Sequence, residues 1–353
     1  MSRWKLVRLK FGHSVAHFGE LGIGLEETSE RIRSDTLFSA WLSAYARLFS
    51  SPEVELLIDQ CKQPTPLFRL SSTFIYQQIN GELIEYLPRP LKFPIHYPAG
   101  DDLAFTKTFK KLKFLPLSTW QRWYQGEGFT DVDRDELIAE TTGTSTGALA
   151  QAGAFKYPQA FKIQKLPKVA IDRTTRATNF YHTGVVSYRW ERQNGKIESQ
   201  SGLYFLVEFP TEDTAFDQIF FAVLNFLGGE GIGGERSSGA GQFKPKVVDL
   251  SSNWTAVTQY KEGTQHCLIS LLWQSELAPA MMAGASYELQ ERGGWITSPT
   301  ADAQQRRQAL QMLAEGSVLS SLPTGALADV TPRNFSAHRV YRSGIAMSLP
   351  LTS

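Results

Sequence analysis

The chain is poor in cysteine and carries almost no net charge. Its 353 residues include only Cys61 and Cys267 as cysteines, and neither has a second sulfur or a histidine at metal-ligand spacing. This argues against a disulfide framework and a zinc site, and it favours a reducing cytoplasm. A formal charge of +1 excludes a general basic field that would attract nucleic acid. Any RNA affinity must therefore come from local patches.

Long apolar runs are also lacking. The longest, near 219–227 and 267–273, are too short to cross a bilayer, and no apolar core follows the charged opening MSRWKLVRLK. We therefore expect a soluble protein with no membrane contact and no standard export signal. Apolar surface as such is plentiful: with 42% hydrophobic and 12% aromatic residues the chain can fold, so disorder is excluded.

Two helices stand out by their periodicity. The first is predicted to begin at Ser34-Asp35, where a side-chain oxygen can cap free N–H groups, and its apolar residues form one stripe up to Leu48. The second is predicted from Thr214, in capping-box relation to Asp217, and is expected to stop at Gly228. The two helices therefore need the same kind of apolar partner.

Strand patterns lie where they can provide that partner. They cover 4–11, 67–76 with a possible hairpin across Asn80-Gly81, 203–209 and 242–250. The resulting order is strand, helix, strand, strand, helix, strand, as in ferredoxin-like RNA-recognition folds. Such a sheet would carry both helices on one face and leave the other face open for a ligand.

The remaining segments define the predicted domains. A ferredoxin-like domain would span 1–250, with a long insertion at about 88–201, and residues 251–353 are expected to form a second, more irregular α+β unit. The predicted fold class is therefore α+β.

The most specific motif is the glycine-rich segment 228–243, GGEGIGGERSSGAGQF, which contains seven glycines. Such a segment can present successive backbone N–H groups to phosphates, while Arg236, Ser237 and Ser238 add one charge and two hydroxyls. The alternative interpretation is a flexible connector. If the segment is a binding loop, a bulky residue at Gly231 or Gly234 should impair binding and leave thermal stability nearly intact.

Nucleotide cofactors are not indicated by this motif. Gly229, Gly231 and Gly234 satisfy the letters of a dinucleotide fingerprint, but they follow a helix and precede a strand, which reverses the required order. A Walker Gly-Lys-Ser/Thr ending is missing as well. We expect no cofactor and no metal.

A second motif, KVAIDRTTRATNFYHTGVVSY at 168–188, mixes cations with aromatic residues. Arg173 and Arg176 stand close to Phe180, Tyr181 and His182, a combination that suits phosphates and stacked bases. An exposed hairpin with ordinary surface arginines is an equally good interpretation of this segment alone.

Together these motifs resemble the repeat-associated mysterious protein (RAMP) superfamily of CRISPR systems, whose members pair an I-D-R-x-T segment with a glycine-rich loop after the second helix. More narrowly, the chain resembles the family of fourth Csm subunits of type III-A effector complexes. The matching segments are HFGELGIGLEETSERIRSDTLFSAW (17–41), RGGWI (292–296), AEGSVL (314–319), GALADVTP (325–332) and HRVYRSGIA (338–346).

This resemblance implies two ferredoxin-like (RRM-like) domains, 1–250 and 251–353, with a long insertion and thumb hairpin. It implies a non-catalytic, cytoplasmic subunit that holds the 5′ handle of the crRNA. It implies contacts with the large polymerase-type Csm subunit and with the first backbone RAMP subunit. It also implies a β-hairpin thumb, around 151–181, that reaches target RNA near the start of the guide duplex. The RNA-binding residues that it implies are His17, Phe18, Arg31, Arg33, Ser34, Arg173, Arg176, Gly229, Gly231, Gly233, Gly234, Arg236, Ser237, Ser238, Gly239 and Gly241.

Some of these residues have structural explanations too. Ser34 could be only a helix cap, and Phe18 could belong to the core. Arg292, Arg333, His338 and Arg342 are not assigned to RNA, because the C-terminal segments could serve packing or a subunit interface.

Two other functions stay open at this point. Related folds cleave repeat RNA with a histidine as general base, and His13 or His17 could take that role, but no stabiliser of the developing charge is evident nearby in the sequence. A protein-only adaptor would fit the near-zero charge but would leave the glycine-rich segment unexplained.

Overall fold

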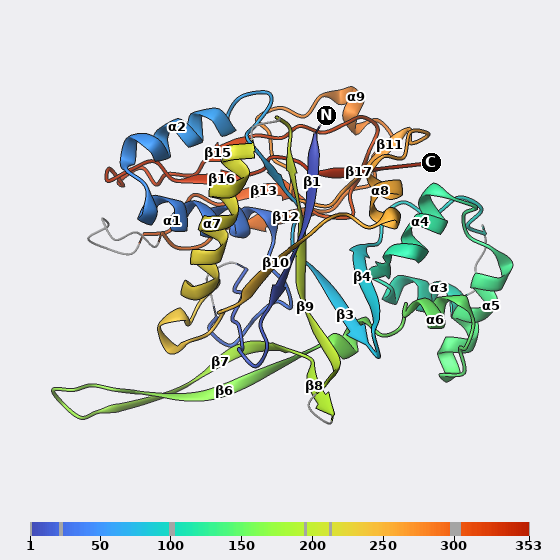
Figure 1. Cartoon of the computed structure of the whole chain (residues 1–353), viewed down its shortest axis with the longest axis horizontal. Coiled ribbons are helices and arrows are strands. Elements are labelled where there is room, and N and C mark those ends of the chain that lie inside the picture. Colours follow the sequence, from blue (N-terminus) through green and yellow to red (C-terminus); the bar gives the residue numbers. More distant parts are fainter. Residues whose placement is uncertain are drawn as a thin grey trace.

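The computed structural model describes residues 2–20, 24–98, 103–193, 196–211, 214–296 and 305–352. Figure 1 shows a sheet at the centre, helices on either side of it and one long hairpin, β6–β7, that projects away from the body. The helices are α1 Ser34–Leu48, α2 Ser51–Cys61, α3 Leu103–Lys111, α4 Leu117–Gln125, α5 Asp131–Ala139, α6 Ala148–Ala152, α7 Thr214–Glu230, α8 Ser252–Thr258 and α9 Pro279–Met282.

Strands account for most of the remaining regular structure. They are β1 Arg3–Lys10, β2 Arg69–Leu70, β3 Phe74–Ile79, β4 Glu82–Pro88, β5 Phe114–Pro116, β6 Phe161–Ile171, β7 Thr178–Tyr188, β8 Trp190–Gln193, β9 Lys196–Phe209, β10 Lys244–Val248, β11 Gln265–Leu268, β12 Leu289–Arg292, β13 Leu310–Leu313, β14 Val318–Leu319, β15 Leu327–Asp329, β16 Tyr341–Ser343 and β17 Ser348–Leu351. Within the described part of the chain all strand pairings are antiparallel, which confirms the α+β class.

The main sheet has the order β10-β1-β9-β3-β4-β5, with β2 and β8 also paired to β9. The hairpin predicted across Asn80-Gly81 is confirmed: β3 and β4 pair on either side of it, and both turn residues have positive φ, 50° and 89°. A two-residue turn of this kind matches the twist of the strands that it connects. The division of the chain at residue 250 and the ferredoxin-like description of each domain stay predictions.

One face of the sheet packs against α1 and α7. Val7 and Leu9 of β1 lie fully buried in the same cluster as Trp41 of α1 and Phe220 of α7. The Trp41 and Phe220 rings stack at 5.0 Å, and the Trp41 indole N–H donates to the Phe220 carbonyl at 3.0 Å. The common partner expected for the two predicted helices is thus the sheet together with the other helix.

The opposite face is not open along its length, which corrects the sequence prediction. Leu6 and Leu206 lie buried there beneath residues of the insertion and of the C-terminal third, among them Trp120 and Leu349. Figure 1 shows α3 to α6 together on the side of the sheet away from α1 and α7. Hydrophobic patterning within β1 and β9 shows that both faces are apolar, but not which distant segment covers the second one.

The predicted helix ends need correction in part. Helix α1 begins at Ser34 as predicted, and the Asp35 carboxylate accepts from the Thr36 amide at 2.8 Å. The residue before the helix, Arg33, makes no capping hydrogen bond, and the Ser34 hydroxyl instead accepts from the Leu271 amide at 2.9 Å. Helix α7 runs through Gly228 to Glu230. Gly228 is buried in the helix, and a Cβ there would lie 2.6 Å from the Phe243 carbonyl oxygen, so this glycine permits close packing and does not stop the helix.

Candidate RNA-binding surface

The glycine-rich segment 228–243 folds back against residues 15–18. The Gly234 amide donates to the His17 carbonyl at 2.9 Å, and the Gly241 amide donates to the Val15 carbonyl at 2.8 Å. Across the segment itself, the Ile232 amide donates to the Gly241 carbonyl at 2.9 Å. The segment is therefore an ordered loop held by its own backbone bonds and is not a free connector.

Several of its glycines serve this packing. Gly233 has φ +96°, and a Cβ there would lie 2.3 Å from the His17 carbonyl oxygen, a distance that real side chains do not show. The amides of Gly231, Gly234, Gly239 and Gly241 already donate to protein carbonyls. The prediction that the loop presents its glycine amides one after another is therefore wrong for these four positions.

A shorter row of amides stays available. Among the residues that the structure describes, the N–H groups of Gly233, Glu235, Arg236 and Ser237 have no hydrogen-bond acceptor. The Arg236 and Ser237 side chains at the same point are exposed and unpaired within the described chain. Successive main-chain donors beside one guanidinium form the kind of concave site that binds phosphate.

We predict opposite effects for alanine at two glycines of this segment. Gly231 has φ +85° with the Ala240 carbonyl oxygen 2.7 Å from an added Cβ, so Gly231→Ala should destabilise the fold by at least about 1 kcal/mol. Gly229 is exposed in α7 with no atom within 4 Å of an added Cβ, so Gly229→Ala should be neutral or stabilising by up to about 1 kcal/mol. Urea unfolding of both variants measures the difference.

This reverses the sequence expectation that Gly231 can be replaced without loss of stability. Equal stability of the two variants would contradict the structural role of Gly231 and restore the expectation drawn from the sequence.

The hairpin β6–β7 contacts this loop partway along its length. Lys168 of β6 forms an ion pair with Glu235 and donates to the Ser238 hydroxyl at 3.1 Å. The hydrogen bond from Lys168 lowers the pKa of Glu235, so this carboxylate stays ionised and neutralised beside the free amides. The structure thus brings the two sequence motifs together along the hairpin.

Arg173 and Arg176 lie at the far end of the hairpin, in the turn between β6 and β7. Asp172 closes the turn by accepting from the Thr174 and Thr175 amides at 2.7 and 2.8 Å. Arg176 has φ 58° and its amide donates to the Asp172 carbonyl. Both arginines are exposed and, as Figure 1 shows, the turn is far from the body of the molecule. They are not part of the loop site.

His17 and Phe18 lie beneath the loop. The His17 ring is 7% exposed, and its Nδ1 is 2.7 Å from the Gly184 carbonyl oxygen of β7. Phe18 belongs to the core and packs edge-on against Phe11 at 6.3 Å. Both residues join the loop to the hairpin and the core, and neither presents its side chain to solvent.

Arg31, Arg33 and Ser34 do not line this loop. Arg31 forms a buried ion pair with Glu315 at 3.1 Å, and Arg33 pairs with both Glu20 and Glu315. Their side chains are committed to protein partners, so we do not include them in the RNA surface.

The same region holds a larger buried network that the sequence did not reveal. Asp35 is fully buried between Arg292 and Arg342, with Arg292 Nε at 2.9 Å, and Arg292 also pairs with Glu20. Burial alone would raise the pKa of Asp35, but the two arginines outweigh it and hold that pKa at about 2. The residues come from the segments 17–41, 292–296, 314–319 and 338–346, so the network accounts for much of what those motifs do in the fold.

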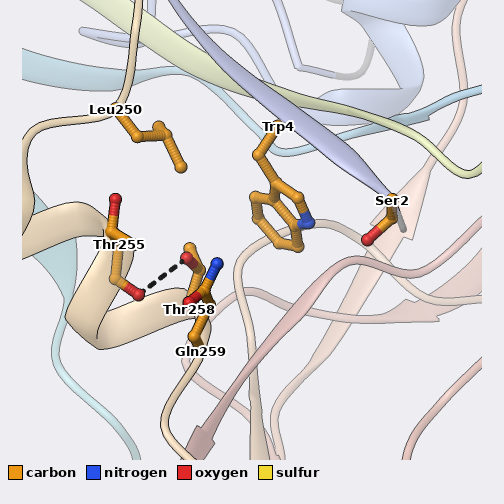
Figure 2. Close-up of a pocket in the computed structure, with 6 residues that line it drawn as sticks. All are labelled: Ser2, Trp4, Leu250, Thr255, Thr258 and Gln259. Carbon is orange, nitrogen blue, oxygen red and sulfur yellow. Dashed lines mark hydrogen bonds between the residues drawn. The ribbon is translucent and has the colours of Figure 1, made fainter.

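A cavity of about 300 Å³ elsewhere carries no site. Figure 2 shows Trp4 of β1 opposite Thr258, the last residue of α8, and Gln259, which follows it. The Thr258 and Thr255 hydroxyls donate to carbonyls of their own helix at 2.9 and 3.0 Å, and no charged side chain lines the cavity. Over the described part of the chain, no group of acidic, histidine or cysteine side chains is arranged to hold a metal, and no helix is long and apolar enough to span a membrane.

Solved structures define the class of fold. The chain is similar to a chain in the crystal structure of the Csm3-Csm4 subcomplex of the type III-A CRISPR-Cas interference complex, with a TM-score of 0.60, 19% identity and coverage of 99% and 100% of the two chains. A chain of the Csm1-Csm4 cassette in complex with cA4 matches with a TM-score of 0.53, 17% identity and coverage of 99% and 98%. The chain thus shares the fold of chains found in the Csm3-Csm4 and Csm1-Csm4 subcomplexes.

Sequence comparison shows which known proteins the chain resembles. Residues 261–351 match the family model described as the CRISPR Csm4 C-terminal domain. The CRISPR system Cms protein Csm4 of Methanocaldococcus jannaschii is 26% identical, with 96% of this chain and 95% of that protein covered. The Csm4 protein of Mycobacterium tuberculosis strain H37Rv is also 26% identical, with 91% and 90% covered. The chain is thus similar to Csm4 proteins over nearly its whole length, which confirms the resemblance seen in the sequence.

Proposed function

We propose that this chain is the crRNA-binding Csm4 subunit of a type III-A Csm complex and that it holds the 5′ handle of the crRNA in the cytoplasm. The observation that carries the proposal is the row of free amides at Gly233 and 235–237 beside the exposed Arg236. Phosphates are the ligands that such a row of donors accepts best.

The hairpin β6–β7 would act as the thumb. Its exposed turn carries Arg173 and Arg176, and next to it Ile171 and Phe180 are 65% and 61% exposed. Large apolar side chains are rarely left in solvent on a narrow hairpin without a partner. Contact with target RNA near the start of the guide duplex would use this end. Csm1-type and Csm3-type subunits are the proposed protein neighbours, in line with the two matched subcomplexes.

We propose further that the subunit does not cleave RNA. His17 lies 7% exposed with one ring nitrogen at the Gly184 carbonyl, a poor position for a general base that must reach a 2′-hydroxyl. His13 packs against Trp190 at 5.9 Å and has no partner that would support proton transfer among the described residues. Cleavage would require a different arrangement of both rings.

The test is binding of a fluorescently labelled repeat RNA to the full chain, measured by anisotropy across a salt series. Arg236→Ala should weaken binding about fivefold, equivalent to about 1 kcal/mol, and should reduce the salt slope by about 0.7. The RNA should be recovered intact. Arg134→Ala on α5 is the matched control, since the Arg134 side chain is 41% exposed and only loosely paired with Asp131 and Asp135 at 4.0 and 3.5 Å.

An unchanged affinity and slope in Arg236→Ala would contradict the loop site. A salt-independent signal would favour a protein-only adaptor, and a defined cut that is lost in His17→Ala would favour the endoribonuclease.

A further inference from the structure

The edge of the main sheet carries two pairs of like charges in direct register. Arg8 of β1 is opposite Lys246 of β10, and Lys10 is opposite Lys244. Directly opposite residues of antiparallel strands lie only about 5 Å apart at Cβ, and like charges in that position destabilise a sheet. Two such pairs in succession are a cost that the fold itself does not require.

Only one of these four cations has an acidic partner within the described residues. Arg8 pairs with Glu85 at 2.9 Å, and Glu85 also accepts the Trp254 indole N–H at 2.6 Å. Lys10, Lys244 and Lys246 have no acidic partner within the described ranges. Burial, and then the charges of Lys246 and Arg8, lower the pKa of Lys10, which shows that these cations lie near one another. Lys244 and Lys246 are exposed.

These side chains lie on the sheet face opposite α1 and α7. Val7 and Leu9 point to the helices, so the alternate residues Leu6, Arg8 and Lys10 share the other face. The insertion and the C-terminal third cover this face at Leu6, but the exposed lysines at the Lys10 end show that the cover ends there. The open face predicted from the sequence is thus reduced to one end of the sheet.

An aromatic side chain continues the row of cations. Along one edge of β9, β1 pairs with residues 203–209 and β8 pairs with residues 196–200, so Trp190 of β8 follows Lys10 along that edge. Trp190 is opposite Gln200 of β9, and the Gln200 side-chain amide donates to the Gln78 side chain of β3. Trp190 therefore lies on the same sheet face as Arg8 and Lys10. His13 and Arg192 lie 5.9 and 5.5 Å from the Trp190 ring, and its indole N–H is buried without an acceptor.

We propose that this end of the sheet is a second RNA-contact surface, on which single-stranded RNA places phosphates at Lys10, Lys244 and Lys246 and a base against Trp190. Cations interleaved with an aromatic ring are the combination that binds single strands without reading sequence. An acidic protein segment would use the lysines but would leave the tryptophan without a role. The inference rests on the proposed function and extends it, because Lys244 directly follows the glycine-rich loop and so continues the path of the same strand.

The test uses the full chain and a labelled oligouridylate of about 16 nucleotides, close to the upper limit for one binding site. The double variant Lys244→Gln, Lys246→Gln should weaken binding about tenfold and reduce the salt slope by about 1.4, since each lost contact contributes about 0.7. Its melting temperature should rise, because two like-charge pairs are relieved. Trp190→Ala should lose at least about fivefold in affinity, and Trp190→Phe should keep most of it.

Lys5→Gln is the matched control. Lys5 lies on β1, as Lys10 does, but it pairs with Asp249 at 2.6 Å. Unchanged affinity and slope in the double lysine variant, together with weakened binding in Arg236→Ala, would overturn this inference alone. If the unmodified chain binds no RNA, both this surface and the proposed function fail. Displacement of the RNA by polyglutamate at equal charge concentration would also overturn it, in favour of an acidic protein partner.

Discussion

Asp35→Ala is expected to destabilise the protein by about 3–5 kcal/mol. The Asp35 carboxylate is fully buried and neutralises both Arg292 and Arg342, whose side chains are only 3% exposed. Removing it leaves two guanidinium groups in a dry interior, and the loss of one partner from a buried ion network has a large cost because the other charge stays behind. Urea unfolding followed by circular dichroism measures the change, with the m-value as a check on the two-state assumption.

A matched control separates burial from charge. Lys62 and Asp59 form an exposed pair on α2 at 3.1 Å, with side chains 40% and 69% exposed. Asp59→Ala should change stability by no more than about 0.5 kcal/mol, because surface pairs contribute little. If Asp35→Ala costs less than about 1 kcal/mol, the network does not hold the fold together as described.

Acid is expected to unfold the protein through the same network. The pKa of Asp35 is lowered from 3.8 to about 2, and that of the buried Glu315 is lowered as well, since Arg31 and Arg33 outweigh its burial. A carboxylate whose pKa is depressed in the folded state contributes stability above its unfolded pKa and loses it as the pH falls through the folded value. Asp35 alone should account for about 2 kcal/mol lost between about pH 4 and pH 2.

Unfolding free energies measured at several pH values test this. Glu315→Gln should be less stable at pH 7, and its stability should fall less steeply below pH 4, because one of the two titrating groups is gone. The control Glu55→Gln removes an exposed carboxylate of α2 and should leave the slope nearly unchanged. If the free energy of unfolding falls equally steeply below pH 4 in all three proteins, the buried network does not cause the loss of stability in acid.

Local signals predicted the elements of the fold well. The 3.6-residue period located α1 and α7, and Asn80-Gly81 located a turn, because both depend on residues close in sequence. The end of α7 was misplaced because a glycine after a helical pattern is a common stop signal. Gly228 instead packs inside the helix against Phe243, which directly precedes the next strand. The open sheet face was mispredicted for a similar reason, since its cover comes from residues more than one hundred positions away from β1.

The candidate site was predicted in part. Composition indicated that the glycine-rich loop is a binding loop, but it did not show which of its amides already donate to protein carbonyls. The Gly234 amide donates to the His17 carbonyl because the loop packs on a segment that is distant in sequence. Arg31 and Arg33 were expected at RNA because their charges suit phosphate, and only the tertiary structure shows Glu315 beside them. The row of cations around Lys10 was missed because it depends on the register between β1 and β10, which neither strand alone specifies.

The network around Asp35 also constrains when the chain can finish folding. During synthesis Asp35, at the start of α1, leaves the ribosome 307 residues before Arg342, one of the two arginines that surround it. Until then the carboxylate must stay hydrated, since burying it unpaired would be too costly. Helix α1 therefore cannot reach its final packing until residue 342 has been synthesised, and a ribosome that stops short of that residue would release a chain in which the Asp35 carboxylate still needs water.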